Sequence, residues 1–272
     1  MGATQSQQEA PFFKMATPKE ASAYLYAAEN QDHYIDEVEQ SRTNAFARQE
    51  MTYVPNKLSA RDAEALEERI NSFLPMIPLK LKDDGIRPVV ISLMPSADGG
   101  MPHTRSPNLI CLPFSAHSLT VETFVHEMWH IHQRRYWSMW TRFYEEAWFF
   151  KPFDITDLPE QLQEVLRINP DTIYQPLFVW KGEWVPMCVF LNPMSPSFKE
   201  TAVWFYNVRT RIHYKNIPSP LASFFSGDLP LTAYEHPNEI AAYMLGNKTL
   251  QSSHAYTVLI HHLGERGKII HF

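Results

Sequence analysis

Two histidines four residues apart, His126 and His130, enclose a glutamate in the stretch His-Glu-Met-Trp-His. On an α-helix this spacing places both imidazoles on one face, one turn apart, where they fill two positions of a tetrahedral zinc ion. Glu127 is offset by about 100° around such a helix, so it can face the open metal position without binding the metal. There it can take a proton from zinc-bound water, which makes the motif a site for zinc-dependent hydrolysis with Glu127 as general base.

The residues around the motif predict the helix that must carry it. Thr120 is a suitable N-cap residue, and an apolar stripe follows it at helical spacing. The stripe consists of Val121, Phe124, Val125 and Met128. An extended stretch at residues 108–114 comes shortly before the helix. A capped amphipathic helix after a strand is the context in which this short motif is meaningful.

Residues 86–130 and 234–243 resemble the zincin superfamily of metallopeptidases. This resemblance implies a motif helix that follows a sheet, with an edge strand that pairs with an extended peptide substrate. Asn108–Phe114 is the candidate edge strand, and the alternative is an internal strand without a free edge.

A catalytic zinc ion has three protein ligands and one open position. Gln133 and Tyr136 stand where the extended HExxHxxGxxH pattern requires Gly and His, which excludes the metzincin branch. The stretch 236–242, His-Pro-Asn-Glu-Ile-Ala-Ala, resembles the gluzincin pattern, in which a downstream helix supplies a glutamate. The resemblance therefore implies that Glu239 is the third zinc ligand, while a helix-start glutamate stabilised by the helix dipole is the ordinary alternative.

Other ligands stay open in the sequence. Glu145 and Glu146 lie closer to the motif, on the next expected helix, and either is an alternative metal ligand. His132 points away from His130 on the same helix. His213, His261 and His262 are remote candidates.

A hydrolase of this kind needs a donor for the negative charge that develops on the attacked carbonyl oxygen. Tyr243 lies four residues after Glu239, and Tyr234 precedes the same expected helix, so both are candidate transition-state stabilisers. The cluster Arg209, Arg211 and His213 is a further candidate. An ordinary position at the edge of the core is the alternative for each tyrosine. Asn238 is a candidate for orienting a metal ligand.

Hydrophobic periodicity and turn residues predict an α+β fold with a small mixed or antiparallel sheet, the motif helix and additional helices. The resemblance to zincins implies that these elements form a zincin-like domain. We expect a flexible leader at residues 1–16, a helical region at 17–78 containing about three helices, and the catalytic domain at 79–272. Strands are expected at 86–93, 108–114, 178–180, 184–191, 201–209 and 268–272. Helices are expected from Thr120 through the motif, and at 137–149, 158–169, 237–246 and 252–263.

The 272 residues carry a formal charge of −6 and form no stripe of Lys and Arg, which argues against nucleic acid as a partner. Two cysteines, Cys111 and Cys188, lie in apolar runs and are interpreted as buried hydrophobic residues of a reducing compartment. The N-terminus has no apolar signal core, so we expect a cytoplasmic and not a secreted protein.

The first six residues, Met-Gly-Ala-Thr-Gln-Ser, match the pattern for myristoylation of Gly2. One acyl chain binds membranes only marginally, so the pattern supports at most reversible association with a membrane or virion surface.

Together the motifs predict a zinc-dependent metallopeptidase that hydrolyses amide bonds of a peptide or protein substrate. Two alternatives remain: a zincin-like metal-binding or interaction module without proteolysis, and a lipid-anchored membrane- or capsid-associated protein in which the motif is incidental. The oligomeric state leaves no mark on the sequence.

Overall fold

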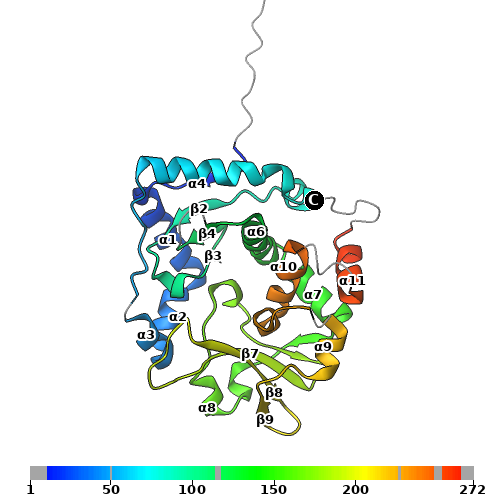
Figure 1. Cartoon of the computed structure of the whole chain (residues 1–272). Helices are drawn as coiled ribbons and strands as arrows, with labels where there is room; N and C mark the ends of the chain where they lie inside the picture. The colour runs from blue at the N-terminus through cyan, green and yellow to red at the C-terminus, as the bar shows by residue number, and fades with distance from the viewer. Residues whose placement is uncertain (1–10, 50, 114–117, 226–227, 248–252, 265–272) are drawn as a thin grey trace, which may run out of the picture.

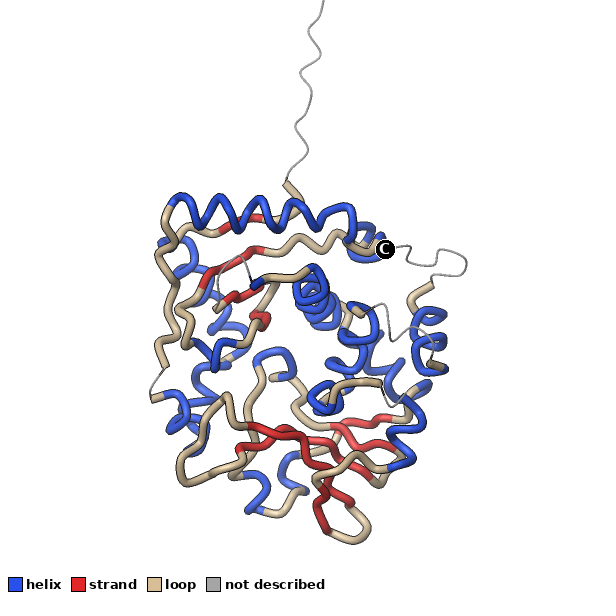
Figure 2. The backbone as a smooth tube through the Cα atoms, in the orientation of Figure 1, coloured by secondary structure: helices blue, strands red, loops and turns tan. Residues whose placement is uncertain are grey.

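The computed structural model describes residues 11–49, 51–113, 118–225, 228–247 and 253–264. It confirms the α+β class. Two separate sheets form, one in the upper part and one near the bottom of the view in Figure 1, and Figure 2 shows their strands in red. Helices α6 (Val121–Arg135) and α10 (Pro237–Gly246) lie between them. Gly2 and the predicted strand at 268–272 lie outside the described residues.

The first sheet is mixed, with the order β1-β2-β4-β3. Its strands are β1 (Lys14–Met15), β2 (Val89–Ser92), β3 (His103–Arg105) and β4 (Leu109–Leu112). β1 and β4 run parallel to β2, and β3 runs antiparallel to β4. β1 lies within residues 1–16, which were expected to form a flexible leader, so regular structure begins before residue 17.

The expected free edge at 108–114 is wrong, because β4 is flanked by strands on both sides. β3 forms the edge instead, and its outward-facing backbone groups already have partners. The Thr104 amide donates to Asp171 Oδ1 at 2.8 Å, and the Thr104 carbonyl accepts from Arg134 Nη2 at 3.4 Å. Since these groups are occupied, β3 does not offer an open ladder to an extended peptide.

The second sheet is antiparallel, with the order β5-β6-β7-β8-β9. Its strands are β5 (Phe150–Pro152), β6 (Phe178–Trp180), β7 (Trp184–Phe190), β8 (Thr201–Asn207) and β9 (Ile212–Tyr214). The strands expected at 178–180 and 184–191 form as β6 and β7 and pair as a hairpin, with Lys181 and Gly182 at positive φ in the turn.

Helices cover the first sheet and connect it to the rest. They are α1 (Pro18–Asp32), α2 (Tyr34–Gln40), α3 (Arg42–Arg48), α4 (Ala60–Phe73) and α5 (Leu79–Asp83). Thr17 and Ser59 cap α1 and α4, and their side chains accept from the amides of Glu20 and Asp62. One hydrophobic core joins α4 to α6 and α10, so the residues predicted as a helical region share their core with the rest.

The remaining helices are α7 (Trp137–Ala147), α8 (Glu160–Gln163), α9 (Ser219–Phe225) and α11 (His254–His262), with short 3-10 turns that include η5 (Pro170–Thr172) and η6 (Leu231–Glu235). α8 has four residues and is much shorter than the helix expected at 158–169. Within the described part of the chain, no helix has the length and apolar character needed to cross a lipid bilayer.

The contact between α6 and α10 positions the site. Thr120 caps α6 as expected. The apolar stripe of α6 is buried at Phe124, Val125 and Met128, and Val121 is partly buried against the core. Gly246 lies at the point of closest approach, where an added Cβ would stand 3.3 Å from the Glu122 carbonyl oxygen. Small residues on α10 (Ala241, Ala242 and Gly246) therefore let its first turn approach the two motif histidines.

Candidate metal centre

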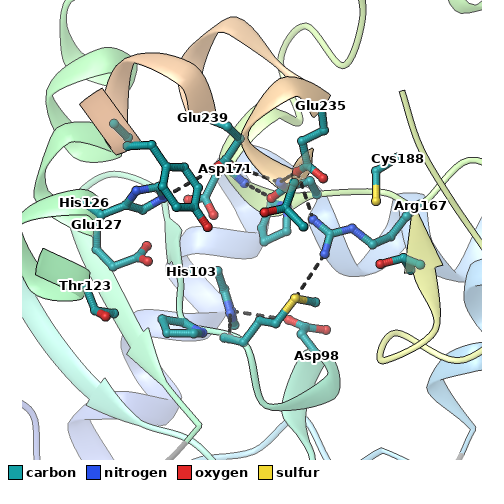
Figure 3. A pocket seen from close by; sticks show the side chains of 18 of the residues that line it. Asp98, His103, Thr123, His126, Glu127, Arg167, Asp171, Cys188, Glu235 and Glu239 are labelled. Atoms are coloured by element: carbon teal, nitrogen blue, oxygen red, sulfur yellow. Dashed lines mark hydrogen bonds and ion pairs between the residues drawn. The ribbon is translucent and has the colours of Figure 1, made fainter. Parts of the chain in front are cut away.

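The side chains of His126 and His130 on α6 and of Glu239 on α10 converge, although up to 113 positions separate them in the sequence. Figure 3 shows His126 and Glu239 next to each other in the pocket. His126 Nε2 lies 2.9 Å from His130 Nε2, and Glu239 Oε2 lies 3.2 Å from His126 Nε2. Glu239 Oε1 lies 3.5 Å from His130 Nε2. The structure thus brings the three predicted ligands together.

These separations fit one tetrahedral metal ion. Ligand atoms about 2.1 Å from a tetrahedral zinc ion lie roughly 3.4 Å from one another. The three observed separations fall on both sides of that value. Two imidazoles and one carboxylate are also a donor set that zinc takes in catalytic sites. His126, His130 and Glu239 therefore fit a zinc ion with one position left open.

A chain of hydrogen bonds orients His130. Its Nδ1 lies 2.8 Å from Gln133 Oε1, and Gln133 Nε2 donates to the Asn238 carbonyl at 2.9 Å. The Tyr144 hydroxyl in turn donates to Asn238 Oδ1 at 2.9 Å. With the amide nitrogen of Gln133 engaged by Asn238, its oxygen faces His130, so Nδ1 carries the hydrogen and Nε2 presents its lone pair to the metal position. The Asn238 backbone carbonyl thus positions Gln133, which contacts the candidate ligand His130.

Glu127 lies beside the three ligands and lines the same pocket. Its side chain is buried, and its Oε2 has no hydrogen-bond partner among the described residues. Burial, together with the negative charge of Asp171, raises the pKa of Glu127 well above its ordinary value. A buried carboxylate with an unfilled acceptor site can take up a proton from a bound molecule.

The pKa values of His130 and Glu239 are shifted in opposite directions. Burial by itself would lower the pKa of His130, but the nearby Glu239 and Asp171 carboxylates raise it to about 10. For Glu239, burial favours the neutral acid, yet His130 and His126 hold its pKa well below the ordinary value. In the metal-free protein His130 is therefore protonated, and its positive charge balances the negative charge of Glu239.

A second grouping of ligand atoms consists of Glu127, His130 and Asp171. It shares His130 with the first grouping. Because Gln133 engages Nδ1, that histidine has one ring nitrogen left for a metal. The two groupings therefore compete for a single ion.

The two predicted tyrosines lie in different places. Tyr243 lines the pocket, and its ring meets that of His126 edge to face with centroids 4.8 Å apart. Tyr234 is fully buried in the core against Phe205 and Phe225 and is not part of the pocket lining. Tyr243 thus stays a candidate stabiliser, whereas Tyr234 does not.

The alternative ligands are elsewhere. Glu145 and Glu146 are exposed on α7 and take no part in the grouping of possible ligands around His126 and His130. The proposal of either as third ligand is wrong, because the buried face of α7 carries Trp140, Phe143 and Tyr144 instead.

Further candidates named from the sequence are also remote from the pocket. Arg209, Arg211 and His213 are exposed at the β8–β9 turn, where His213 stacks on Trp204. His132 faces away from the ligands, as expected, and its Nε2 lies 2.7 Å from Asp84 Oδ2. His262 packs on Phe143, and His261 shares its helix, α11.

The pocket has a volume of about 370 Å³. The residues that line it include the candidate metal ligands His126 and Glu239. They also include a second group of polar residues that the sequence did not predict, among them Arg167, Asp171 and Glu235. Gln133 could have been found from its i+3 spacing to His130. Nothing in the local sequence marks the others, which reach the pocket from short turns between α8 and α10.

Comparisons of the chain with protein-family models, with curated protein sequences and with solved structures return no match. Function is therefore inferred from the residues of the site themselves.

Proposed function

We propose that the chain is a zinc-dependent metallopeptidase of the zincin type, which hydrolyses amide bonds in peptides or proteins. The observation that carries this proposal is the convergence of His126, His130 and Glu239 at 2.9 to 3.5 Å, with Glu127 beside them in one pocket. Two histidines and a glutamate account for metal binding, and only Glu127 adds a reason for hydrolysis.

His126, His130 and Glu239 would hold the zinc ion. A bound zinc ion supplies a Lewis acid that polarises a carbonyl oxygen and lowers the pKa of water. Gln133 keeps the His130 ring oriented for this task through its bond to Nδ1.

Glu127 would move the protons. Its Oε2 has no partner among the described residues, so it can accept a proton from the attacking water. Once protonated, Glu127 would be placed to return that proton to the leaving amine. Tyr243, which lines the pocket next to His126, is the side chain that we assign as donor to the developing oxyanion.

Elemental analysis of zinc per chain tests the metal site. We expect close to one zinc ion in the wild type and in Glu146→Gln, whose carboxylate is exposed, and loss of zinc in Glu239→Gln. The two variants make the same chemical change, so a difference between them reflects position. A wild-type protein that binds no zinc after reconstitution would contradict the proposal.

Hydrolysis of a defined peptide mixture, followed by mass spectrometry, tests the reaction. Glu127→Gln should retain zinc and lose about 10²- to 10⁴-fold in rate, which is the usual contribution of a general base. Zinc binding without any wild-type cleavage would favour the alternative of a metal-binding module without proteolysis.

A further inference from the structure

Arg167 lies at the end of the pocket that faces the metal ligands. Figure 3 places it on the opposite side of the pocket from His126 and Glu127, all three being part of one lining. The Arg167 side chain is only 9% exposed, so its permanent positive charge is held largely away from water.

The donors of Arg167 are incompletely used. Its Nη2 donates to Glu235 Oε1 at 3.2 Å, and its Nη1 meets the thioether sulfur of Met101 at 3.3 Å. Its Nε has no partner among the described residues. A guanidinium offers five N–H donors, and thioether sulfur is a weak acceptor. Arg167 therefore lacks an oxygen acceptor for Nε and for Nη1 in the part of the chain that the structure describes.

Neighbouring charges do not supply that acceptor. Asp98 Oδ1 pairs with Arg48 at 2.9 Å, and Glu235 Oε1 also accepts from Asn169 at 2.6 Å. Arg48 also has unpartnered nitrogens, but it is not part of the pocket lining and stacks on the rings of Tyr34 and Tyr53. Arg167 is therefore the cation that faces the pocket with unused donors.

We propose that Arg167 binds a carboxylate of the substrate, an inference that rests on the proposed peptidase function. A planar guanidinium matches a carboxylate through two parallel hydrogen bonds. Three successive contacts join the two ends of the pocket: Arg167 to Glu235, Glu235 to Asn169 at 2.6 Å, and Asn169 to Glu239 at 3.3 Å. An extended residue spans about 3.3–3.6 Å, so the carboxylate lies one or two residues beyond the attacked amide.

Two sources of this carboxylate exist in a peptide. A free C-terminus would make the protein a carboxypeptidase or dipeptidase, and an aspartate or glutamate side chain would make it an endopeptidase with acidic preference. Both sources present the same group to Arg167, and matched peptides separate them.

Binding is measured by calorimetry with zinc-loaded Glu127→Gln protein, so that bound peptides are not hydrolysed. The first pair of short peptides differs only in a C-terminal carboxylate or amide. The second pair is amidated and differs only in an internal Glu or Gln. We expect one pair to show about 10- to 100-fold tighter binding of the acid, the range for a hydrogen-bonded charge pair. Equal binding within both pairs would overturn the proposal.

Substitutions then assign the effect. Adding Arg167→Gln should remove the preference for the acid, and adding Arg209→Gln, which neutralises an exposed arginine, should keep it. Adding Glu235→Gln should strengthen binding of the acid, because the competing carboxylate next to Arg167 is gone. That gain cannot arise from misfolding, so it tests the proposal even if Arg167→Gln does not fold. An unchanged or weaker acid preference in the Glu235→Gln protein would contradict it.

Hydrolysis by the wild type is recorded with the same peptides. Cleavage of both members of each pair at equal rates would leave the peptidase proposal standing and remove the carboxylate subsite. Preferential binding of the acid without cleavage of any peptide would support the carboxylate subsite and contradict the peptidase proposal.

Discussion

Two buried clusters of charged residues differ in how completely their hydrogen bonds are satisfied. In the first, Arg105 donates through Nε to both Asp32 oxygens at 3.1 and 2.9 Å, and through Nη2 to Asp32 and Glu29 at 2.6 Å. Its Nη1 donates to the Tyr53 hydroxyl at 3.2 Å. In the second, the facing atoms of the candidate ligands His126, His130 and Glu239 have one another as partners at 2.9 to 3.5 Å, and Glu127 Oε2 has no partner among the described residues.

We interpret this difference as one between a buried charge cluster that stabilises the fold and one that is kept for a function. Moving an ion out of water is costly unless partners replace the lost hydration. The Arg105 cluster has those partners within the chain, so it needs nothing more, and it ties α1 to β3. In the proposed function, a cation and a substrate would supply the partners that the cluster of His126, His130, Glu239 and Glu127 lacks.

The largest effect should follow from breaking the satisfied cluster. Arg105→Met keeps much of the side-chain length but leaves Asp32 buried without its cation, which we expect to lower the free energy of unfolding by about 3–5 kcal/mol. Urea denaturation followed by circular dichroism measures this loss. Arg209→Met, at an exposed ion pair of 3.9 Å, should change stability little. Equal losses in the two variants would refute the distinction between the clusters.

An intermediate effect is expected from Gln133, whose side chain contacts His130 of the incomplete cluster. Gln133→Met removes the acceptor that orients His130 Nδ1, and we expect about 10- to 100-fold weaker zinc binding. Competition with a zinc-binding dye measures the affinity. Gln163 on α8 has a comparable amide, which donates to the Leu158 carbonyl. Gln163→Met should therefore leave the zinc affinity unchanged. An unaltered affinity in Gln133→Met would mean that the α6–α10 packing alone orients His130.

The smallest effect near neutral pH should appear as opposite titrations of two histidines on α6. Burial lowers the pKa of His132 to about 4, whereas Glu239 helps to raise that of His130 to about 10. From an ordinary value of 6.5, His132 therefore contributes stability that is present above pH 6.5 and lost as the pH falls toward 4. In the zinc-free protein, His130 contributes stability that is present below pH 6.5 and lost as the pH rises toward 10.

NMR titration of the two imidazoles in zinc-free protein tests these directions. Because zinc must displace the proton on His130, zinc affinity should also rise with pH over the same range. Two histidines that titrate together near pH 6.5 would show that their environments do not differ as described.

The sequence by itself determined the local parts of this protein. Thr120 and Ser59 cap their helices, Pro237 begins α10, and the 3.6-residue repeat places His126 and His130 on one face. These features depend on residues within one or two turns of each other, so local propensity and spacing are sufficient to predict them. The edge strand and the length of α8 were predicted wrongly, because strand neighbours and helix ends there depend on distant residues.

Only the tertiary structure decided which carboxylates meet the histidines. Glu146 and Glu239 both follow the motif on helices, but α7 turns its aromatic face inward and leaves Glu146 exposed, while small residues on α10 bring Glu239 against α6. Asp171 and Arg167 enter the same pocket from irregular segments. No spacing rule links residues that the chain connects through long loops, because packing of the intervening core sets their separation.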